Sequence, residues 1–175
     1  MKRALVVVDC LNDFLSLEGS LNCGEAGRQV IPAIARELES ARKSGTPVIY
    51  VCDRHLPDDR EFELYPPHCV AGSWGAEIVG ELKPGPQERV VPKRRFSAFF
   101  GTDLELQLHE QGIEEIRLVG VCTNICVLYT AADARMRGFE VAVPADAVAS
   151  FDEAAHENAL RELSSVLKAR VEVAD

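Results

Sequence analysis

Four residues with chemically capable side chains lie at or just beyond the ends of predicted strands. Asp9, Asp53 and Lys93 each close a short apolar run, and Cys126 follows a fourth run after a tight turn. In a mostly parallel sheet, ligands bind outside the carboxyl ends of the strands, so these four side chains would meet at one edge. A single aspartate at a strand end is often only a cap and a single lysine is usually solvated, but four such groups together favour an active site.

A cysteine in the first turn of a helix can act as a nucleophile. Cys126 is predicted to lie in such a turn, where free backbone N–H groups and the helix dipole favour the thiolate. A small buried hydrophobe is the other role of a free cysteine, and this stretch alone does not choose between the two. Asp9 can take the thiol proton and later pass it to a leaving amine, while Lys93 holds Asp9 and stabilises the thiolate. With the backbone N–H groups of Cys122 and Cys126 binding an oxyanion, the set suits hydrolysis of an amide through a thioester.

A second group of polar residues lies in the long loop over residues 53–74. Asp53 and His55 are two apart, which places both side chains on the same side of an extended chain. His68 follows later in the loop, with Glu61 between the two histidines. Two histidines with one or two carboxylates suit Zn²⁺, Fe²⁺ or Mn²⁺ with positions left open for water or substrate. Loops are rich in such residues in any case, so an ordinary polar loop is the alternative.

Strands and helices alternate along the chain. Apolar, often β-branched runs predict six strands, at 4–8, 48–52, 89–92, 117–121, 141–143 and 171–173. Helical periodicity and start and stop signals predict helices over 30–44, 76–82, 102–111, 126–137 and 150–168, with capping-box patterns at 102 and 150. This order predicts a three-layer α/β fold, with helices on both faces of a mostly parallel, Rossmann-like six-stranded sheet, in a single domain over residues 1–175.

The composition limits the class of partner. With 175 residues, 47% of them hydrophobic, the chain can form one domain with a sizeable core. The net charge of −9 argues against nucleic acid and anionic membranes as partners, since both select basic surfaces. No apolar run approaches the ~20 residues of a membrane span, and the apolar N-terminal run is too short for a signal peptide. We therefore expect a cytoplasmic protein with reduced thiols and a small-molecule substrate. A homo-oligomer is also expected, but not on the basis of composition.

Five blocks of the chain carry a resemblance to a known family. They cover residues 8–14, 53–55, 65–77, 93–99 and 120–127. Three of these blocks, which contain Asp9, Lys93 and Cys126, resemble those of the isochorismatase-like cysteine hydrolases. The Asp-Arg-His and Pro-Pro-His-Cys-Val blocks resemble the nicotinamidase branch, because other branches generally lack that metal site. The resemblance extends over nearly the whole chain.

The resemblance implies a specific reaction. Nicotinamide would be hydrolysed to nicotinate and ammonia, with Asp9, Lys93 and Cys126 as the catalytic triad of an isochorismatase-like hydrolase fold. The family usually has a cis peptide bond that shapes the oxyanion hole, and here it would join Val121 to Cys122.

The resemblance also implies how the ring is bound. A metal held by Asp53, His55 and His68, with zinc expected first and iron or manganese next, would coordinate the pyridine nitrogen. Glu61 matches a fourth ligand seen in only some members. Many members have a further histidine soon after the Asp-x-His block, where this chain has the stretch 57–60. The implied substrate contacts are Phe14, Tyr65, Phe96 and Val121.

Three other functions compete with this one. A related cysteine hydrolase of another small amide or carbamoyl compound would use the same triad. Two histidines and a carboxylate also describe a non-haem iron oxygenase, which leaves Asp9, Lys93 and Cys126 without a role. A catalytically silent metal- or partner-binding domain is the third, and thiol alkylation without any effect on amide turnover would favour it.

Overall fold

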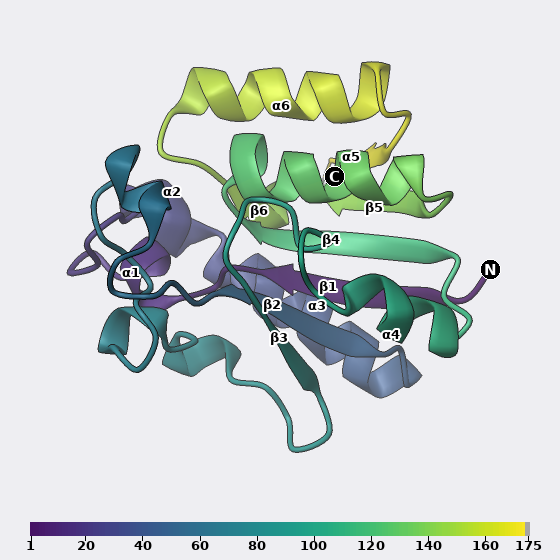
Figure 1. Cartoon of the computed structure of the whole chain (residues 1–175). Coiled ribbons are helices and arrows are strands. Elements are labelled where there is room, and N and C mark those ends of the chain that lie inside the picture. Colours follow the sequence, from purple (N-terminus) through teal and green to yellow (C-terminus); the bar gives the residue numbers. More distant parts are fainter. Residues whose placement is uncertain (174–175) are drawn as a thin grey trace.

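The computed structural model describes residues 1–173, and within them a parallel sheet lies between two layers of helices (Figure 1). The strand order is β3-β2-β1-β4-β5-β7, with β6 beside β4 and off this path. The strands are β1 (Arg3–Val8), β2 (Val48–Asp53), β3 (Arg89–Lys93), β4 (Glu115–Val121), β5 (Glu140–Pro144), β6 (Val148–Ala149) and β7 (Arg170–Glu172). The predicted three-layer α/β fold with a mostly parallel sheet is confirmed.

The number of strands was predicted wrongly. The described part of the chain forms seven strands and not six, because β6 adds two residues to the edge of β4, where Gly120 pairs with Val148. A two-residue strand that follows a 3₁₀ turn is too short to show a periodic pattern in the sequence. The six longer strands lie where the apolar runs predicted them, within two residues at each end.

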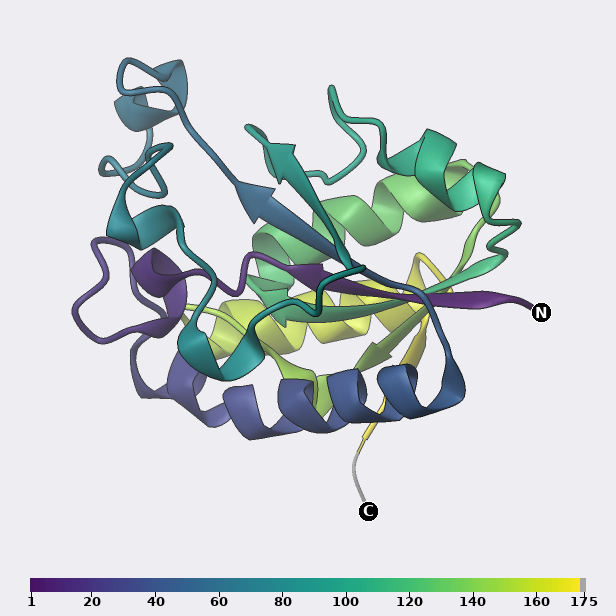
Figure 2. The same cartoon turned by 90° about the horizontal axis from the view of Figure 1, so that it is seen from below.

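Alternation along the strands divides the core between the two faces of the sheet. Leu5 and Val7 of β1 belong to the cluster of buried side chains that includes α3, whereas Val6 and Val8 belong to the cluster that includes α4, α5 and α6. Figure 2 shows α3 on one side of the sheet and α4 and α5 on the other. The helices are α1 (Asn12–Leu15), α2 (Gly24–Gln29), α3 (Ile31–Ser44), α4 (Leu104–Glu110), α5 (Leu128–Met136) and α6 (Glu153–Ser165). No helix among the described residues is long and apolar enough to cross a membrane.

Three predicted helices differ from the structure at their starts. α4 begins at Leu104 and not at residue 102, and its N-cap residue Asp103 makes no side-chain capping hydrogen bond. The side chain that caps α6 is Asp152, which accepts from the Ala155 N–H at 2.7 Å, and not Ser150 as the capping-box pattern suggested. Ser150 instead donates its hydroxyl to Asn124. The predicted helix over 76–82 is replaced by two 3₁₀ turns at Trp74–Ala76 and Gly80–Leu82, neither of which is long enough to form an α-helix.

Close packing of β1 against β4 requires a glycine at position 120. Gly120 has φ +115°, and a Cβ there would lie 1.9 Å from the backbone oxygen of Val8. We expect Gly120→Ala to lower the free energy of unfolding by at least ~3 kcal/mol, a loss in thermal midpoint of roughly 6–12 °C. Gly80→Ala is the matched control, because a Cβ there meets nothing within 4 Å. Equal melting temperatures for the two variants would show that the β1–β4 contact relaxes more easily than its geometry indicates.

Candidate active site

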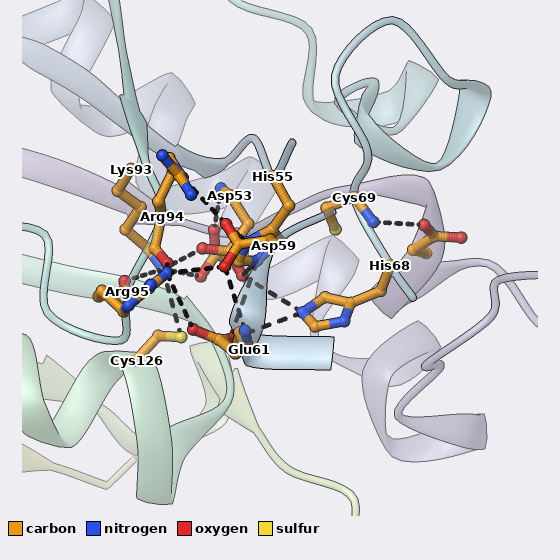
Figure 3. Close-up of polar contacts among 12 residues, drawn as sticks. Asp53, His55, Asp59, Glu61, His68, Cys69, Lys93, Arg94, Arg95 and Cys126 are labelled. Atoms are coloured by element: carbon orange, nitrogen blue, oxygen red, sulfur yellow. Dashed lines mark hydrogen bonds and ion pairs between the residues drawn. The ribbon is translucent and has the colours of Figure 1, made fainter. Parts of the chain in front are cut away.

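Parallel neighbours in the sheet bring the predicted groups to one edge. Asp9 follows β1 directly with φ +50°, and the last residues of β2 and β3, Asp53 and Lys93, pair in register. Cys126 follows the carboxyl end of β4 after a tight turn. The structure therefore brings together all four side chains that the sequence placed at strand ends. Figure 3 labels three of them, Asp53, Lys93 and Cys126.

Lys93 is the centre of this group. Its Nζ lies 2.6 Å from Asp53 Oδ1, 2.9 Å from Asp9 Oδ2 and 3.4 Å from Cys126 Sγ, and it also donates to the backbone oxygen of Arg95 at 3.0 Å. The Cys126 sulfur and one carboxylate oxygen of each aspartate lie within 4.8 Å of one another. Asp9 is held from its other side, where Oδ1 accepts from the Asp53 N–H at 2.7 Å. The Lys93 ammonium thus contacts both the Cys126 thiol and the Asp9 carboxylate, away from bulk solvent.

Burial and charge set the resting protonation of these groups. Burial and the neighbouring Asp53 carboxylate raise the pKa of Asp9 to about 6, against the opposite effect of Lys93. Burial alone would lower the pKa of Lys93, but Asp53 and Asp9 outweigh it and raise that pKa well above its usual value. Burial also raises the pKa of Cys126 well above its usual value, although the charge of Lys93 lowers it. The prediction that this thiol ionises easily was wrong for the resting protein, so the thiol needs a base, and Asp9 is within reach.

Cys126 lies in a π-helical turn and not in the first turn of a regular α-helix. The turn spans Thr123–Val127 ahead of α5, and the Val127 N–H donates to the Cys122 oxygen at 3.1 Å. The peptide bond between Val121 and Cys122 is cis, as the resemblance implied. His156 of α6 is half-buried and shares a hydrogen bond of 2.8 Å with the Thr123 hydroxyl.

Beside the triad, four predicted metal ligands converge. Asp53, His55, Glu61 and His68 are all buried, and one ligand atom of each lies within 4.8 Å of the others. His55 Nε2 lies 3.5 Å from Asp53 Oδ2 and 3.8 Å from Glu61 Oε1, and His68 Nε2 lies 3.8 and 3.9 Å from the same two oxygens. Figure 3 shows these groups facing one another around a common centre.

The donor set fits a divalent metal ion. Among the described residues, His55 Nε2 is a buried nitrogen without a hydrogen-bond partner, and it faces this centre. The other ring nitrogen of each histidine is already engaged, by Asp59 at 3.1 Å for His55 and by the Pro66 oxygen at 2.7 Å for His68. Two imidazoles oriented in this way, with two carboxylates, are the ligand types of zinc, iron and manganese sites.

Sequence reasoning missed two roles in this region. Asp53 belongs to both groups, since Oδ1 accepts from Lys93 while Oδ2 faces the histidines. Asp59 was seen only as part of the stretch 57–60 that replaces a family histidine, yet it is buried and bonded to His55. Burial raises the pKa of a carboxyl, but the donors around Asp59 outweigh this and hold its pKa well below the usual value. The only indication in the sequence that Asp59 contacts His55 was its position four residues after that histidine.

A pocket opens onto both groups. It contains about 310 Å³ of empty space, its open mouth included, and has Asp53, Glu61, His68 and Cys126 in its walls. The rest of the wall is mostly aromatic and aliphatic, and consists of Phe14, Leu21, Tyr65, Phe96, Cys122, Ile125 and Phe151. Of the predicted substrate contacts, Phe14, Tyr65 and Phe96 therefore line the pocket. Val121 does not appear among the described residues of the wall, because its side chain is fully buried in the core beside α3.

Comparison with known proteins identifies relatives over the full length. The model of the isochorismatase domain matches residues 3–175. A relative in Bacillus subtilis (strain 168), described as the uncharacterized isochorismatase family protein PncA, is 41% identical over 181 residues, with 98% of this chain and 99% of that protein covered.

Three solved structures share the fold. The nicotinamidase/pyrazinamidase PncA from Bacillus subtilis has a TM-score of 0.94 at 40% identity, covering 98% of this chain and 100% of that one. The N-carbamoylsarcosine amidase from Thermoplasma acidophilum has a TM-score of 0.91 at 36% identity, covering 100% and 98%. The pyrazinamidase of Pyrococcus horikoshii, solved in complex with zinc, has a TM-score of 0.90 at 29% identity, covering 100% and 99%.

Proposed function

The chain belongs to the isochorismatase family of hydrolases, and from that premise we propose that it is a nicotinamidase, a metal-assisted cysteine amidohydrolase that converts nicotinamide to nicotinate and ammonia. One observation carries the proposal. A cluster of two histidines and two carboxylates shares Asp53 with the Cys126 group, and both open into one pocket with aromatic walls. The similarity to solved nicotinamidases supports the same activity.

The proposed reaction has two halves. In the first, Asp9 takes the Cys126 proton, the thiolate attacks the carboxamide carbon, and Asp9 returns the proton to the leaving nitrogen as ammonia departs. In the second, Asp9 takes a proton from water, whose oxygen attacks the thioester carbon. The C–S bond breaks, Asp9 returns that proton to the sulfur, and the product leaves as nicotinate after its remaining acid proton passes to solvent. Lys93 keeps its charge throughout and stabilises the thiolate from 3.4 Å. We propose the backbone N–H groups of Cys122 and Cys126 as the donors to the oxyanion.

We further propose that the metal ion is zinc, held by Asp53, His55, Glu61 and His68. When bound, it would act as a Lewis acid that holds the pyridine nitrogen and so orients the carboxamide. The zinc complex of the Pyrococcus horikoshii pyrazinamidase supports this choice. Iron and manganese accept the same donors and are the alternatives.

A second candidate substrate is a carbamoyl compound, which the similarity to the N-carbamoylsarcosine amidase favours. N-carbamoylsarcosine carries a carboxylate and has no ring, so its binding would rest on polar partners and not on aromatic walls. The described residues of the pocket wall include neither arginine nor lysine, and their ionisable groups include the carboxylates of Asp53 and Glu61. A mostly aromatic and aliphatic wall favours a flat aromatic amide such as nicotinamide.

Release of ammonia tests the proposal directly. Purified, zinc-loaded protein is incubated with nicotinamide or with N-carbamoylsarcosine, and ammonia is measured by a coupled assay. We expect turnover of nicotinamide and little of the carbamoyl compound. Ammonia released only from N-carbamoylsarcosine would support the second candidate. If neither compound releases ammonia, both candidate functions are excluded.

Metal removal should affect substrate binding more than the chemistry at sulfur. Because the chain supplies its own nucleophile and base, a metal-bound hydroxide would be redundant. We expect chelation, or His55→Ala combined with His68→Ala, to raise KM for nicotinamide at least ~10-fold, which is about 1.4 kcal/mol of binding. Benzamide lacks the ring nitrogen, so it should be a poor substrate whose turnover is unchanged by chelation. Steady-state kinetics with both amides, before and after chelation, measure this difference.

Alkylation of Cys126 serves as the control for metal removal. Its rate should stay within about twofold in the metal-free protein, because Asp9 and Lys93 remain in place. If metal-free protein binds nicotinamide normally but no longer forms the thioester, the metal takes part in the chemical step and the assignment is wrong.

A further inference from the structure

Asp59 lies outside both the triad and the four proposed metal ligands, yet its side chain is completely buried beside them. It contacts His55 on one side and the arginines that follow Lys93 on the other (Figure 3). We propose that Asp59 is a positioning residue that fixes His55 in the one tautomer able to bind a metal ion.

The described residues place four donors around the Asp59 carboxylate. Oδ2 lies 3.1 Å from His55 Nδ1 and accepts from Arg94 Nε at 2.9 Å. Oδ1 accepts from the Glu61 N–H at 3.1 Å and from Arg95 Nη1 at 3.0 Å. A carboxylate with this environment only accepts hydrogen bonds, so the ring nitrogen facing it must be the protonated one.

The tautomer follows from that single contact. A neutral imidazole with its proton on Nδ1 has a free lone pair on Nε2, and only a nitrogen with a free lone pair binds a metal. His55 Nε2 lies 3.5 Å from Asp53 Oδ2 and 3.8 Å from Glu61 Oε1, at the centre of the cluster. Asp59 therefore selects the form of His55 that the cluster needs, as carboxylates behind metal-bound histidines do in general.

Asparagine at this position is predicted to reverse the selection. Whichever way its amide is turned, the NH₂ group would face donors. Of the four groups that surround position 59, only His55 can exchange its donor nitrogen for an acceptor, because guanidinium and backbone N–H groups only donate. The amide NH₂ would then point to His55 Nδ1, the imidazole proton would move to Nε2, and the lone pair toward the metal would be lost.

A purely structural role for Asp59 makes the opposite prediction. Asparagine matches aspartate in shape, so it would be milder than alanine if Asp59 only filled space and bonded Arg94 and Arg95. If tautomer selection is its role, Asp59→Asn is at least as harmful to metal binding as Asp59→Ala, because alanine leaves His55 free to adopt either tautomer. The order of the two variants therefore separates the two roles.

Zinc affinity provides the measurement. The full-length protein and its variants compete with a chromophoric chelator for Zn²⁺, and melting temperatures without metal confirm that each variant is folded. We expect Asp59→Asn to bind Zn²⁺ roughly 10–100-fold more weakly than the wild type, and Asp59→Ala no more weakly than Asp59→Asn. Asp58→Asn is the matched control, since Asp58 is the exposed neighbour, and it should bind as the wild type does.

A spectroscopic measurement covers the case in which a variant fails to fold. Long-range ¹H–¹⁵N correlation on metal-free wild-type protein at alkaline pH should show the His55 proton on Nδ1. A proton on Nε2, wild-type zinc affinity in Asp59→Asn, or a wild-type protein that binds no Zn²⁺ would each overturn the proposal. None of these measurements depends on the hydrolysis of an amide substrate, so their outcome is independent of whether nicotinamide is the substrate.

Discussion

Replacing Cys126 with alanine should lower kcat for nicotinamide hydrolysis by at least ~10⁴-fold, because no other group at the site can form the thioester. The described residues place the Cys126 sulfur 3.4 Å from Lys93 Nζ and within 4.8 Å of an Asp9 oxygen, and Cys126 lines the pocket. Burial raises the pKa of the thiol, so the reaction depends on a nearby base, and Asp9 is that base. Ammonia release by the zinc-loaded variant, compared with the wild type at saturating nicotinamide, gives the loss.

Cys122 provides the matched control for this experiment. Its thiol also lines the pocket, but its sulfur faces Cys23 at 3.6 Å and not the aspartate–lysine pair. Cys122→Ala keeps the backbone N–H that is proposed to bind the oxyanion, so activity should remain measurable. Mass spectrometry of partly alkylated wild-type protein should show Cys126 modified first. More than a few per cent of wild-type activity in Cys126→Ala would exclude the covalent mechanism.

Strand ends were the most predictable part of the site. Once the apolar runs before Asp9, Asp53 and Lys93 are taken as parallel strands, their carboxyl ends must lie along one edge, whatever the details of packing. The same reasoning places Cys126 there, one turn after β4. Short-range sequence patterns were therefore sufficient to bring together groups that lie far apart in the chain.

Properties that depend on several contacts at once were not predictable. The pKa of Cys126 depends on how deeply the sulfur is buried and on three charged neighbours, and a helix-start pattern contains neither. The π-helical turn at Thr123–Val127 depends on a backbone hydrogen bond that no residue type dictates. The role of Asp59 required the positions of four donors, of which only the Glu61 N–H and His55 are close in sequence.

Asp53 joins the two groups. Its two oxygens divide between Lys93 and the histidines, so the ion pair and the proposed metal-binding cluster share a single carboxylate on β2. A substitution at Asp53 would therefore disturb both groups, and its effect on activity could not be assigned to either. The triad is better tested through Asp9 and Lys93, neither of which is a proposed metal ligand.

Asp9→Asn and Lys93→Ala should each lower kcat at least ~10²-fold, and the double variant should be little worse than either one. Their side chains are 2.9 Å apart and both are completely buried, so each depends on the other. Without the carboxylate, the Cys126 thiol has no base. Without the ammonium, Asp9 and Asp53 are two buried carboxylates with no lysine between them, and neither the thiolate nor the base is held in place.

Stability measurements should show the same coupling with the same sign and more strongly. Lys93→Ala leaves an uncompensated buried charge, which typically costs about 3–5 kcal/mol. Adding Asp9→Asn removes one of those negative charges, so the double variant should melt at a higher temperature than Lys93→Ala alone. Lys83→Ala, an exposed lysine, controls for the loss of a positive charge and should change neither kcat nor melting temperature appreciably. Losses in log kcat that simply add in the double variant would mean that Asp9 and Lys93 act separately, and the proposed proton transfer through one coupled group would then be wrong.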